Sequence, residues 1–265
     1  TKAEKEEYNM DEDGNSLDSY DTYIRCGFCD EIYTKSECKY ERNLGWLCPS
    51  CEAAIYSRGE KLTFVDPDAS EEELAKAFKP NTKAVFAETV SNPSLVVLDI
   101  EKFARLAHSH GVPLILDNTF ATPINCRPFE WGADIVTHST TKYMDGHAMA
   151  VGGAIVDSGN FDWEAHAEKF PGLTTPDESY HGITYAERFG KGAYITKATA
   201  QLMRDLGSIQ SPQNAFYLNV GLESLHLRMK KHCENALAVA KYLKANEKVA
   251  WVNYADLEDD QYNDI

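Results

Sequence analysis

The chain has 265 residues, of which 43% are hydrophobic and 26% are charged, a composition that is ordinary for a globular protein with a sizeable core. Its formal net charge of −16 argues against binding to the phosphate backbone of DNA or RNA, which requires Lys and Arg. No apolar run approaches the roughly 18 residues of a membrane-spanning helix, and the polar N-terminus does not have the form of a secretory signal. We therefore expect a cytoplasmic protein with neither a nucleic-acid nor a membrane partner.

The first sixty residues differ in composition from the rest. Residues 1–20 are polar and acidic and lack helical or strand periodicity, which indicates a lead-in without regular structure. Residues 23–51 are rich in cysteine and aromatic residues. We expect residues 1–60 to form the lead-in and a small cysteine-rich module.

Four cysteines in this module stand in two C-x-x-C pairs that are separated by eighteen residues. This spacing is typical of a zinc site with four thiolate ligands, in which each pair comes from a tight turn. Metal binding would supply stability that such a small core lacks. The alternative is a set of free or redox-active thiols. The segment resembles a zinc ribbon, with the predicted ligands Cys26, Cys29, Cys48 and Cys51.

From residue 61 onward, short apolar runs alternate with amphipathic patterns. Ser70 and Asp99 each stand where a helix N-cap is expected, and Gly111 stands where the second helix should end. Strands that alternate with helices of this length predict right-handed βαβ units and a parallel sheet. The expected strands are 62–65, 83–87, 112–116 and 133–136, and the expected helices are 71–80, 99–110, 192–206 and 222–243.

Polar residues follow three of the apolar runs. The carboxyl ends of parallel strands meet at one edge of a sheet, so we expect these residues to converge. The Lys142 amine could form an imine with pyridoxal 5'-phosphate (PLP), while the Ser and Thr hydroxyls that precede it bind the phosphate. Asp117 could pair with the pyridine nitrogen, which makes the ring an electron sink, and Asn92 could donate to the phenolic oxygen. Taken singly, Asp117 is more often a turn or cap residue and Lys142 a surface lysine.

The segment from Asp134-Ile135 through Ser139-Thr140-Thr141-Lys142-Tyr143 to Gly146-His147 resembles the cofactor-attachment signature of the Cys/Met-metabolism PLP-dependent enzymes. Ala148 departs from the pattern, because the family usually carries Ser, Gly, Asn or His there. Within the family the chain is most similar to the O-acetylhomoserine sulfhydrylases. The resemblance extends over about 64–260 and is carried by 64–68, 81–89, 169–174, 180–182, 211–216 and 221–224.

The resemblance implies an aminotransferase-like α/β fold: a three-layer large domain with a mainly parallel sheet over 61–245, and the start of a small domain over 246–265. It implies γ-replacement on O-acetylhomoserine, in which sulfide displaces acetate to give homocysteine. Lys142 would hold the cofactor and then move protons at Cα and Cβ of the substrate. Asp117 and Asn92 would bind the ring as above, and Ser139 and Thr141 would contact the phosphate. Members of the family assemble as homo-oligomers.

Several parts of the family pattern have no match. The glycine-rich phosphate loop and the ring-stacking Tyr have no counterpart before residue 61, and we interpret Tyr56-Ser57-Arg58 as a coincidental likeness to the Tyr-Arg pair that contacts a neighbouring subunit. The Arg that binds the substrate carboxylate is also unmatched. We therefore expect a truncated domain that is poorly active or inactive alone. The alternatives are a cystathionine γ-synthase or γ-lyase, or a non-catalytic zinc-ribbon interaction protein with a degenerate PLP-type domain.

Overall fold

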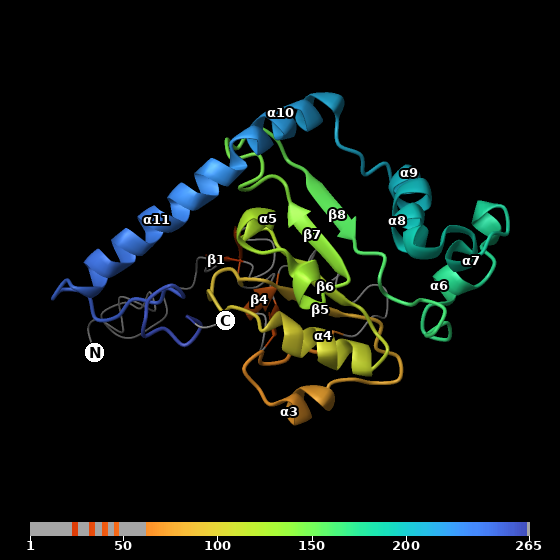
Figure 1. Ribbon diagram of the computed structural model, residues 1–265, viewed down its shortest axis with the longest axis horizontal. Helices are drawn as coiled ribbons and strands as arrows, with labels where there is room; N and C mark the ends of the chain where they lie inside the picture. The colour runs from red at the N-terminus through yellow and green to blue at the C-terminus, as the bar shows by residue number, and fades with distance from the viewer. Residues whose placement is uncertain (1–22, 26–31, 35–38, 42–44, 48–61, 264–265) are drawn as a thin grey trace. The chain divides into compact units, whose positions relative to one another are not determined.

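The computed structural model describes residues 23–25, 32–34, 39–41, 45–47 and 62–263 (Figure 1). The chain divides into two compact units, Thr1–Asp66 and Pro67–Ile265. In the first unit, β1 (Tyr23–Arg25) pairs with β2 (Ile32–Thr34), and β3 (Lys39–Glu41) pairs with β4 (Gly45–Leu47), both antiparallel. The four predicted zinc ligands lie outside the described residues.

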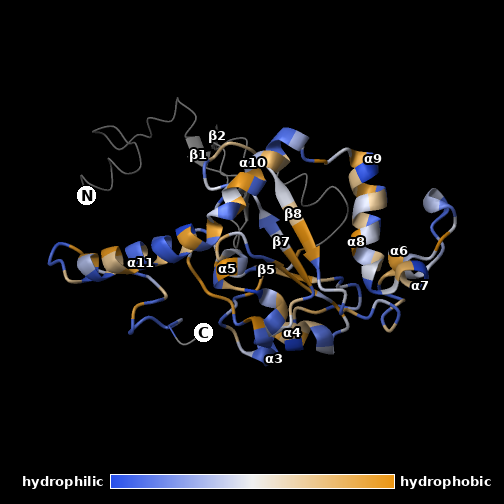
Figure 2. Cartoon of the chain, turned by 45° about the horizontal axis from the view of Figure 1, so that its top comes forward, coloured by the Kyte–Doolittle hydropathy of each residue, from blue (hydrophilic) through white to orange (hydrophobic). Residues whose placement is uncertain are grey.

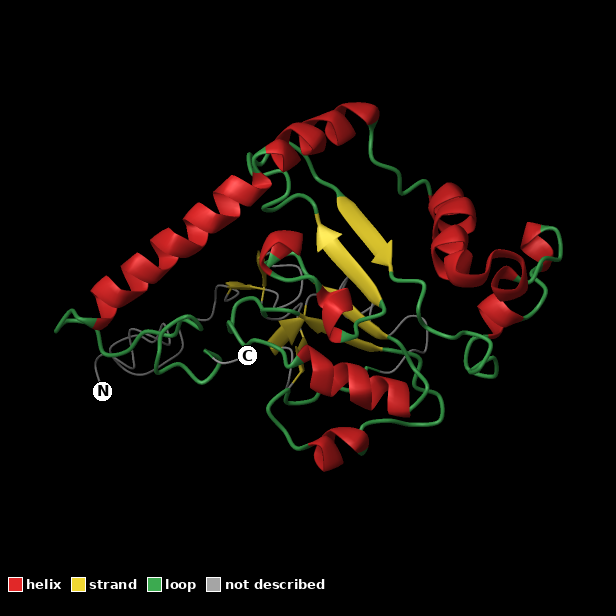
Figure 3. Cartoon of the chain, viewed as in Figure 1, coloured by secondary structure: helices red, strands yellow, loops and turns green. Residues whose placement is uncertain are grey.

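The second unit is built on a four-stranded sheet in the order β5-β6-β7-β8 (yellow in Figure 3). The first three strands are parallel, as predicted, and β8 runs antiparallel to β7. Residues 62–65 form no strand, so that expectation is wrong. β8 was not predicted, because its glycine-rich beginning reads as a loop. The strands are β5 (Val85–Glu88), β6 (Leu114–Asp117), β7 (Ile135–Ser139) and β8 (Gly153–Asp157).

The helices α3 (Glu71–Ala75) and α4 (Ile100–Ser109) begin where the sequence predicts. Ser70 caps α3 through a hydrogen bond that its Oγ accepts from Glu73 N (3.3 Å), and Asp99 caps α4 in the same way through Lys102 N (3.0 Å). α3 ends five residues before the predicted limit at 80. Gly111, at φ +64°, takes the chain from α4 back toward β6.

Apolar side chains cover both faces of the sheet, which gives the predicted three layers. On one face, Leu114, Leu116 and Val136 pack with Phe103 and Ala107 of α4. On the other face, Ile135 belongs to a second cluster of buried residues. Figure 2 shows the hydrophobic part of β8 as an orange segment. The second cluster consists of Ile135, Trp163, Leu173, Tyr185, Ala186 and Ala193.

The later helices differ from the prediction. The helix expected over 192–206 is interrupted by a π-helical segment, and the helix expected over 222–243 is preceded by a separate helix that Ser211 caps. None of the helices in the described part of the chain is both long and apolar enough to cross a bilayer. The remaining elements are α5 (Thr122–Asn125), η2 (Pro128–Trp131), α6 (Pro171–Thr174), η3 (Glu178–Tyr180), α7 (Tyr185–Phe189), η4 (Gly190–Gly192), α8 (Ala193–Lys197), η5 (Ala198–Met203), α9 (Arg204–Leu206), α10 (Pro212–Glu223) and α11 (Leu225–Lys244).

Candidate functional site at the strand ends

The carboxyl ends of β5, β6 and β7 lie side by side. The strand register pairs Glu88 with Asp117 and Asp117 with Thr137. Side chains at paired positions share a face of a sheet, and every second residue along a strand returns to that face. Asp117 therefore faces the same side as Ser139, which ends β7. The sequence predicted this convergence of polar residues.

Thr119 joins the ends of β6 and β7. Its backbone N–H donates to Asp117 Oδ1 (2.8 Å), and its Oγ1 accepts from the backbone N–H of Ser139 (2.7 Å). The turn thus orients the Asp117 carboxylate and fixes the last residue of β7, from which the loop leads to Lys142. Sequence reasoning missed Thr119. The available signal was the Asp-x-Thr spacing, in which an Asp side chain commonly accepts from the N–H two residues on.

The loop that follows β7 holds the backbone of Lys142 and leaves its side chain exposed. The Lys142 N–H donates to Ser139 O (3.3 Å), and its carbonyl accepts from Gly146 N (2.9 Å). The hydroxyl of Thr141 donates to Gly152 O (3.2 Å) and accepts from Gly152 N (3.0 Å). Thr141 must therefore give up its bond to Gly152 O before its hydroxyl can donate to a phosphate.

Asn92 lies farther along the sheet edge, on the turn after β5. Its side chain is exposed, and its backbone N–H donates to Glu88 Oε2 (2.8 Å). The structure thus places Asp117, Ser139, Thr141 and Lys142 at or just beyond the ends of two adjacent strands. Asn92 follows the strand on the other side of β6.

His138 is a buried neighbour that the sequence did not single out. It lies on β7 with its side chain 7% exposed, and its Nδ1 has no hydrogen-bond partner among the described residues. Burial lowers the pKa of His138, although the charge of Asp117 and a hydrogen bond to the backbone of Asn118 oppose this shift. We expect His138 to be neutral near pH 7.

The side chains at these strand ends fit the functional groups of PLP. A primary amine matches the aldehyde, a carboxylate held by a backbone N–H matches the pyridine nitrogen, and two hydroxyls match the phosphate. Metal ions require a different set of ligands. Within 62–263 and the four described N-terminal strands, no group of three or more His, Cys, Asp or Glu side chains could hold a metal ion.

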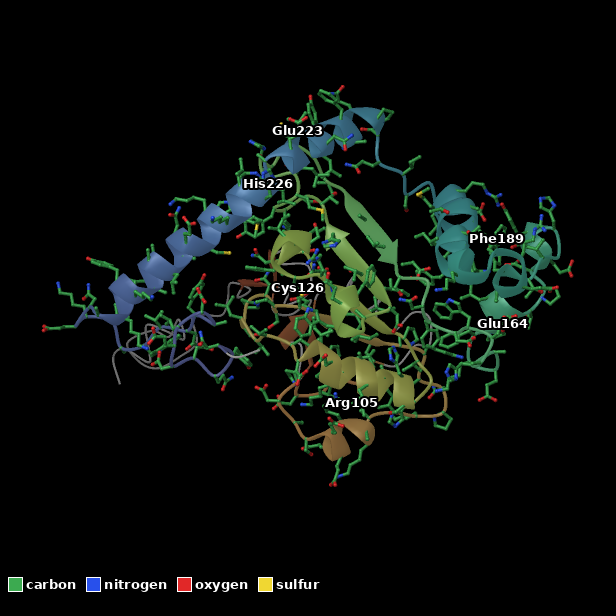
Figure 4. All side chains as sticks on the ribbon, viewed as in Figure 1. Arg105, Cys126, Glu164, Phe189, Glu223 and His226 are labelled. Atoms are coloured by element: carbon green, nitrogen blue, oxygen red, sulfur yellow. The ribbon has the colours of Figure 1, made fainter. Side chains whose placement is uncertain are left out.

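A cavity of about 690 Å³ lies next to this region. Tyr143 and Phe120 line it together with residues of α4, α11 and 254–256, but none of the five predicted cofactor residues does. Cys126, which follows α5 and is labelled in Figure 4, also lines the cavity, and burial raises the pKa of its thiol. A thiol with a raised pKa is a poor nucleophile near pH 7. Because the cavity lacks the predicted cofactor residues and Cys126 is a poor nucleophile, the strand ends remain the candidate site.

A mainly parallel sheet between two layers of helices, with an exposed lysine just beyond a strand end, is the arrangement that the cofactor-attachment signature implied. The chain belongs to the Cys/Met metabolism PLP-dependent enzyme family, whose family model matches residues 49–265.

Individual relatives are similar over about three quarters of the chain. It is 47% identical over 200 residues to the homocysteine/cysteine synthase of Saccharomyces cerevisiae, covering 75% of this chain and 45% of that protein. It is 44% identical over 211 residues to the O-acetyl-L-homoserine sulfhydrylase of Leptospira meyeri, covering 77% and 47%. The chain thus spans about half the length of the curated relatives it matches.

A solved structure shares the fold. The putative O-acetylhomoserine (thiol)-lyase of Campylobacter jejuni, whose crystal structure contains N'-pyridoxyl-lysine-5'-monophosphate, has a TM-score of 0.74 and is 34% identical, covering 81% of this chain and 53% of that one. The similarity in sequence and the similarity in fold therefore point to the same family.

Proposed function

We propose that this chain carries the cofactor-binding part of an O-acetylhomoserine sulfhydrylase. The reaction is a γ-replacement: sulfide forms a bond to Cγ of O-acetylhomoserine, and acetate leaves with the electrons of the broken C–O bond. The placement of Asp117 beside the Ser139–Lys142 loop is the observation that carries the proposal, and the similarity to sulfhydrylases supports it. Cystathionine γ-synthase and γ-lyase activities are the alternatives within the family.

Each side chain has a defined role in the proposal. Bound PLP supplies an electron sink for charge that develops at the substrate. Lys142 holds the cofactor through its amine and then carries protons at Cα and Cβ of the substrate. Asp117, oriented by Thr119, accepts a hydrogen bond from the pyridine nitrogen. Ser139 and Thr141 donate to the phosphate, and Asn92 donates to the ring oxygen.

The activity of the whole enzyme requires more than this chain in our proposal. The alignments cover 45% and 47% of the length of the two curated relatives. We propose that the 265-residue chain alone turns over poorly or not at all, and that the complete enzyme is a cytoplasmic homo-oligomer that takes an amino-acid substrate and sulfide. The domain limits of 61–245 and 246–265 belong to the same proposal.

Covalent capture of the cofactor tests the role of Lys142. The full chain is mixed with PLP, reduced with borohydride, digested and analysed by mass spectrometry. We expect a pyridoxyl adduct on Lys142, and the total yield of pyridoxyl adduct should fall more than ~10-fold in Lys142→Ala, because Lys142 lies just beyond the end of β7, the strand that pairs with Asp117. Lys230→Ala, which removes an exposed amine of α11, is the matched control and should keep the adduct. An adduct spread evenly over many lysines would contradict the proposal and favour a non-catalytic scaffold.

We also propose that Cys26, Cys29, Cys48 and Cys51 hold one structural zinc ion. The C-x-x-C spacing supports this. Metal analysis of the purified chain should give about one zinc per chain. The ion should be lost in Cys29→Ser and retained in the control Cys233→Ser. Absence of zinc, with all thiols titratable under native conditions, would refute the proposal.

A further inference from the structure

Hydrogen bonds between residues of the same turn hold the backbone that follows Lys142. Besides the bond between Gly146 N and Lys142 O, the Asp145 N–H donates to Thr140 O (3.0 Å). The Asp145 side chain is 2% exposed, and its Oδ2 accepts from the backbone N–H of Met149 (2.9 Å). The carbonyls of Tyr143 and Met144 take no part in these bonds.

Arg228, in the first turn of α11, occupies those carbonyls. Its Nη1 donates to Tyr143 O (2.7 Å), and its Nη2 donates to Met144 O at a longer 3.4 Å. The same guanidinium donates through Nη2 to Gly221 O (2.7 Å) and through Nε to Ser224 Oγ (3.0 Å). One half-buried side chain therefore joins the two residues after Lys142 to the junction between α10 and α11.

Two glycines allow this close contact. A Cβ on Gly221 would lie 2.3 Å from Asp145 O and 2.6 Å from Met144 O, so the backbone of α10 rests directly on the turn. A Cβ on Gly146 would lie 2.5 Å from Arg228 Cζ, and Gly146 has φ +72°, where a side chain is disfavoured. Any larger residue at either position would displace the turn or the guanidinium.

Arginine is suited to this position by its geometry and its charge. The planar guanidinium presents five donors in a fixed fork, whereas a lysine ammonium is a single point and cannot reach carbonyls on both sides. Gly221 O belongs to the last turn of α10, where carbonyls lack helical partners and a cation is favoured. Met229 and Leu225, both 3% exposed, anchor this end of α11 in the core.

We propose that Arg228 is a positioning residue for the cofactor lysine: it fixes the backbone of the Lys142 turn to the α10–α11 junction, so that the amine is presented to the strand ends that carry Asp117. This inference rests on the proposed function for its link to the cofactor. The contacts themselves are made within the chain. Arg228 itself touches neither substrate nor cofactor in this proposal.

The test compares Arg228→Lys with Arg105→Lys, which changes an exposed arginine of α4 that pairs with Glu71. Hydrogen exchange of the full chain without cofactor reports on the turn, because the Gly146 amide donates to Lys142 O. We expect protection of the 143–149 segment to fall at least ~10-fold in Arg228→Lys and to stay at the wild-type level in Arg105→Lys. PLP affinity, followed by visible absorption and borohydride capture on Lys142, should also fall about 10-fold or more.

A purely structural role would give a different pattern. If Arg228→Lys unfolds at lower urea concentration but keeps the protection of 143–149 and the PLP affinity of the folded chain, the proposal is overturned. If Arg228→Lys does not fold, Ser224→Ala replaces it, since this change keeps the guanidinium and removes the partner of Nε together with the longer bond (3.4 Å) that Ser224 Oγ donates to Gly221 O. It should lower the protection of 143–149 about twofold to threefold, and unchanged protection overturns the proposal. A wild-type chain that captures no PLP would refute the proposed function, while the exchange data would still decide the role of Arg228.

Discussion

At the scale of single residues, His138 is the clearest titratable group in the site region. Burial lowers the pKa of His138 below its ordinary value of 6.5. The unfolded chain therefore takes up this proton at a higher pH than the folded chain. The free energy of unfolding is unaffected by His138 above about pH 6.5, and it falls as the pH drops from there through the folded pKa.

We predict that His138→Asn weakens this acid sensitivity. Urea unfolding at about pH 8 and about pH 5 should show a smaller loss of stability on acidification in the variant than in the wild type, because the group that binds the extra proton is gone. His226→Asn, which changes an exposed histidine of α11 labelled in Figure 4, should keep the wild-type difference. An equal loss of stability on acidification in His138→Asn and wild type would show that His138 does not cause the acid sensitivity.

At the scale of elements, Asp134 joins α4, β6 and β7. Asp134 is 3% exposed, and its Oδ2 accepts from the backbone N–H of Leu114 (2.8 Å) and contacts His108 Nε2 at 2.7 Å. Its own N–H donates to Leu114 O (3.0 Å). The first residue of β6 is thus held by the residue just before β7 and, through it, by the last turn of α4.

We predict that Asp134→Ala lowers the free energy of unfolding by ~1–3 kcal/mol, because the buried N–H of Leu114 loses its side-chain acceptor. Equilibrium urea unfolding at neutral pH measures the change. Glu164→Ala, which removes an exposed carboxylate labelled in Figure 4, should change stability by less than about 0.5 kcal/mol. Equal values for the two variants would show that the Asp134 contacts add nothing to stability.

The elements that were predicted well are those with local signals. The helix α4 has a capping Asp99, an apolar face and a terminating Gly111 within thirteen residues, and the two end signals each act over one turn. The π-helical segment Ala198–Met203 and the separate helix α10 were not predicted. The apolar pattern around Ala198–Met203 resembles that of a continuous helix, whereas α10 has almost no apolar face at helical spacing, so periodicity alone detects neither feature.

At the scale of the whole molecule, the second unit buries the centre of its sheet and exposes its edges. Leu116 on β6 and Ile135 on β7 are both 0% exposed, whereas Phe86 on β5 is 63% exposed and Ile155 on β8 is 48% exposed. β5 and β8 are the outer strands of the described sheet. The most deeply buried apolar residues of the sheet therefore lie on β6 and β7, the two strands whose ends hold Asp117 and the Lys142 loop.

The sequence by itself determined the parallel strands β5, β6 and β7, the capped helices, the family and the identity of the candidate cofactor lysine. The strands, the caps and the lysine depend on residues close together in the chain, and the family depends on several such local motifs read in order along it. The tertiary structure alone decided the antiparallel placement of β8, the link from Thr119 to Ser139 and the contact between Arg228 and Tyr143 O, which lie 85 residues apart. The reason is physical: a hydrogen bond between distant segments depends on how whole elements pack, and no local propensity or periodicity encodes that geometry.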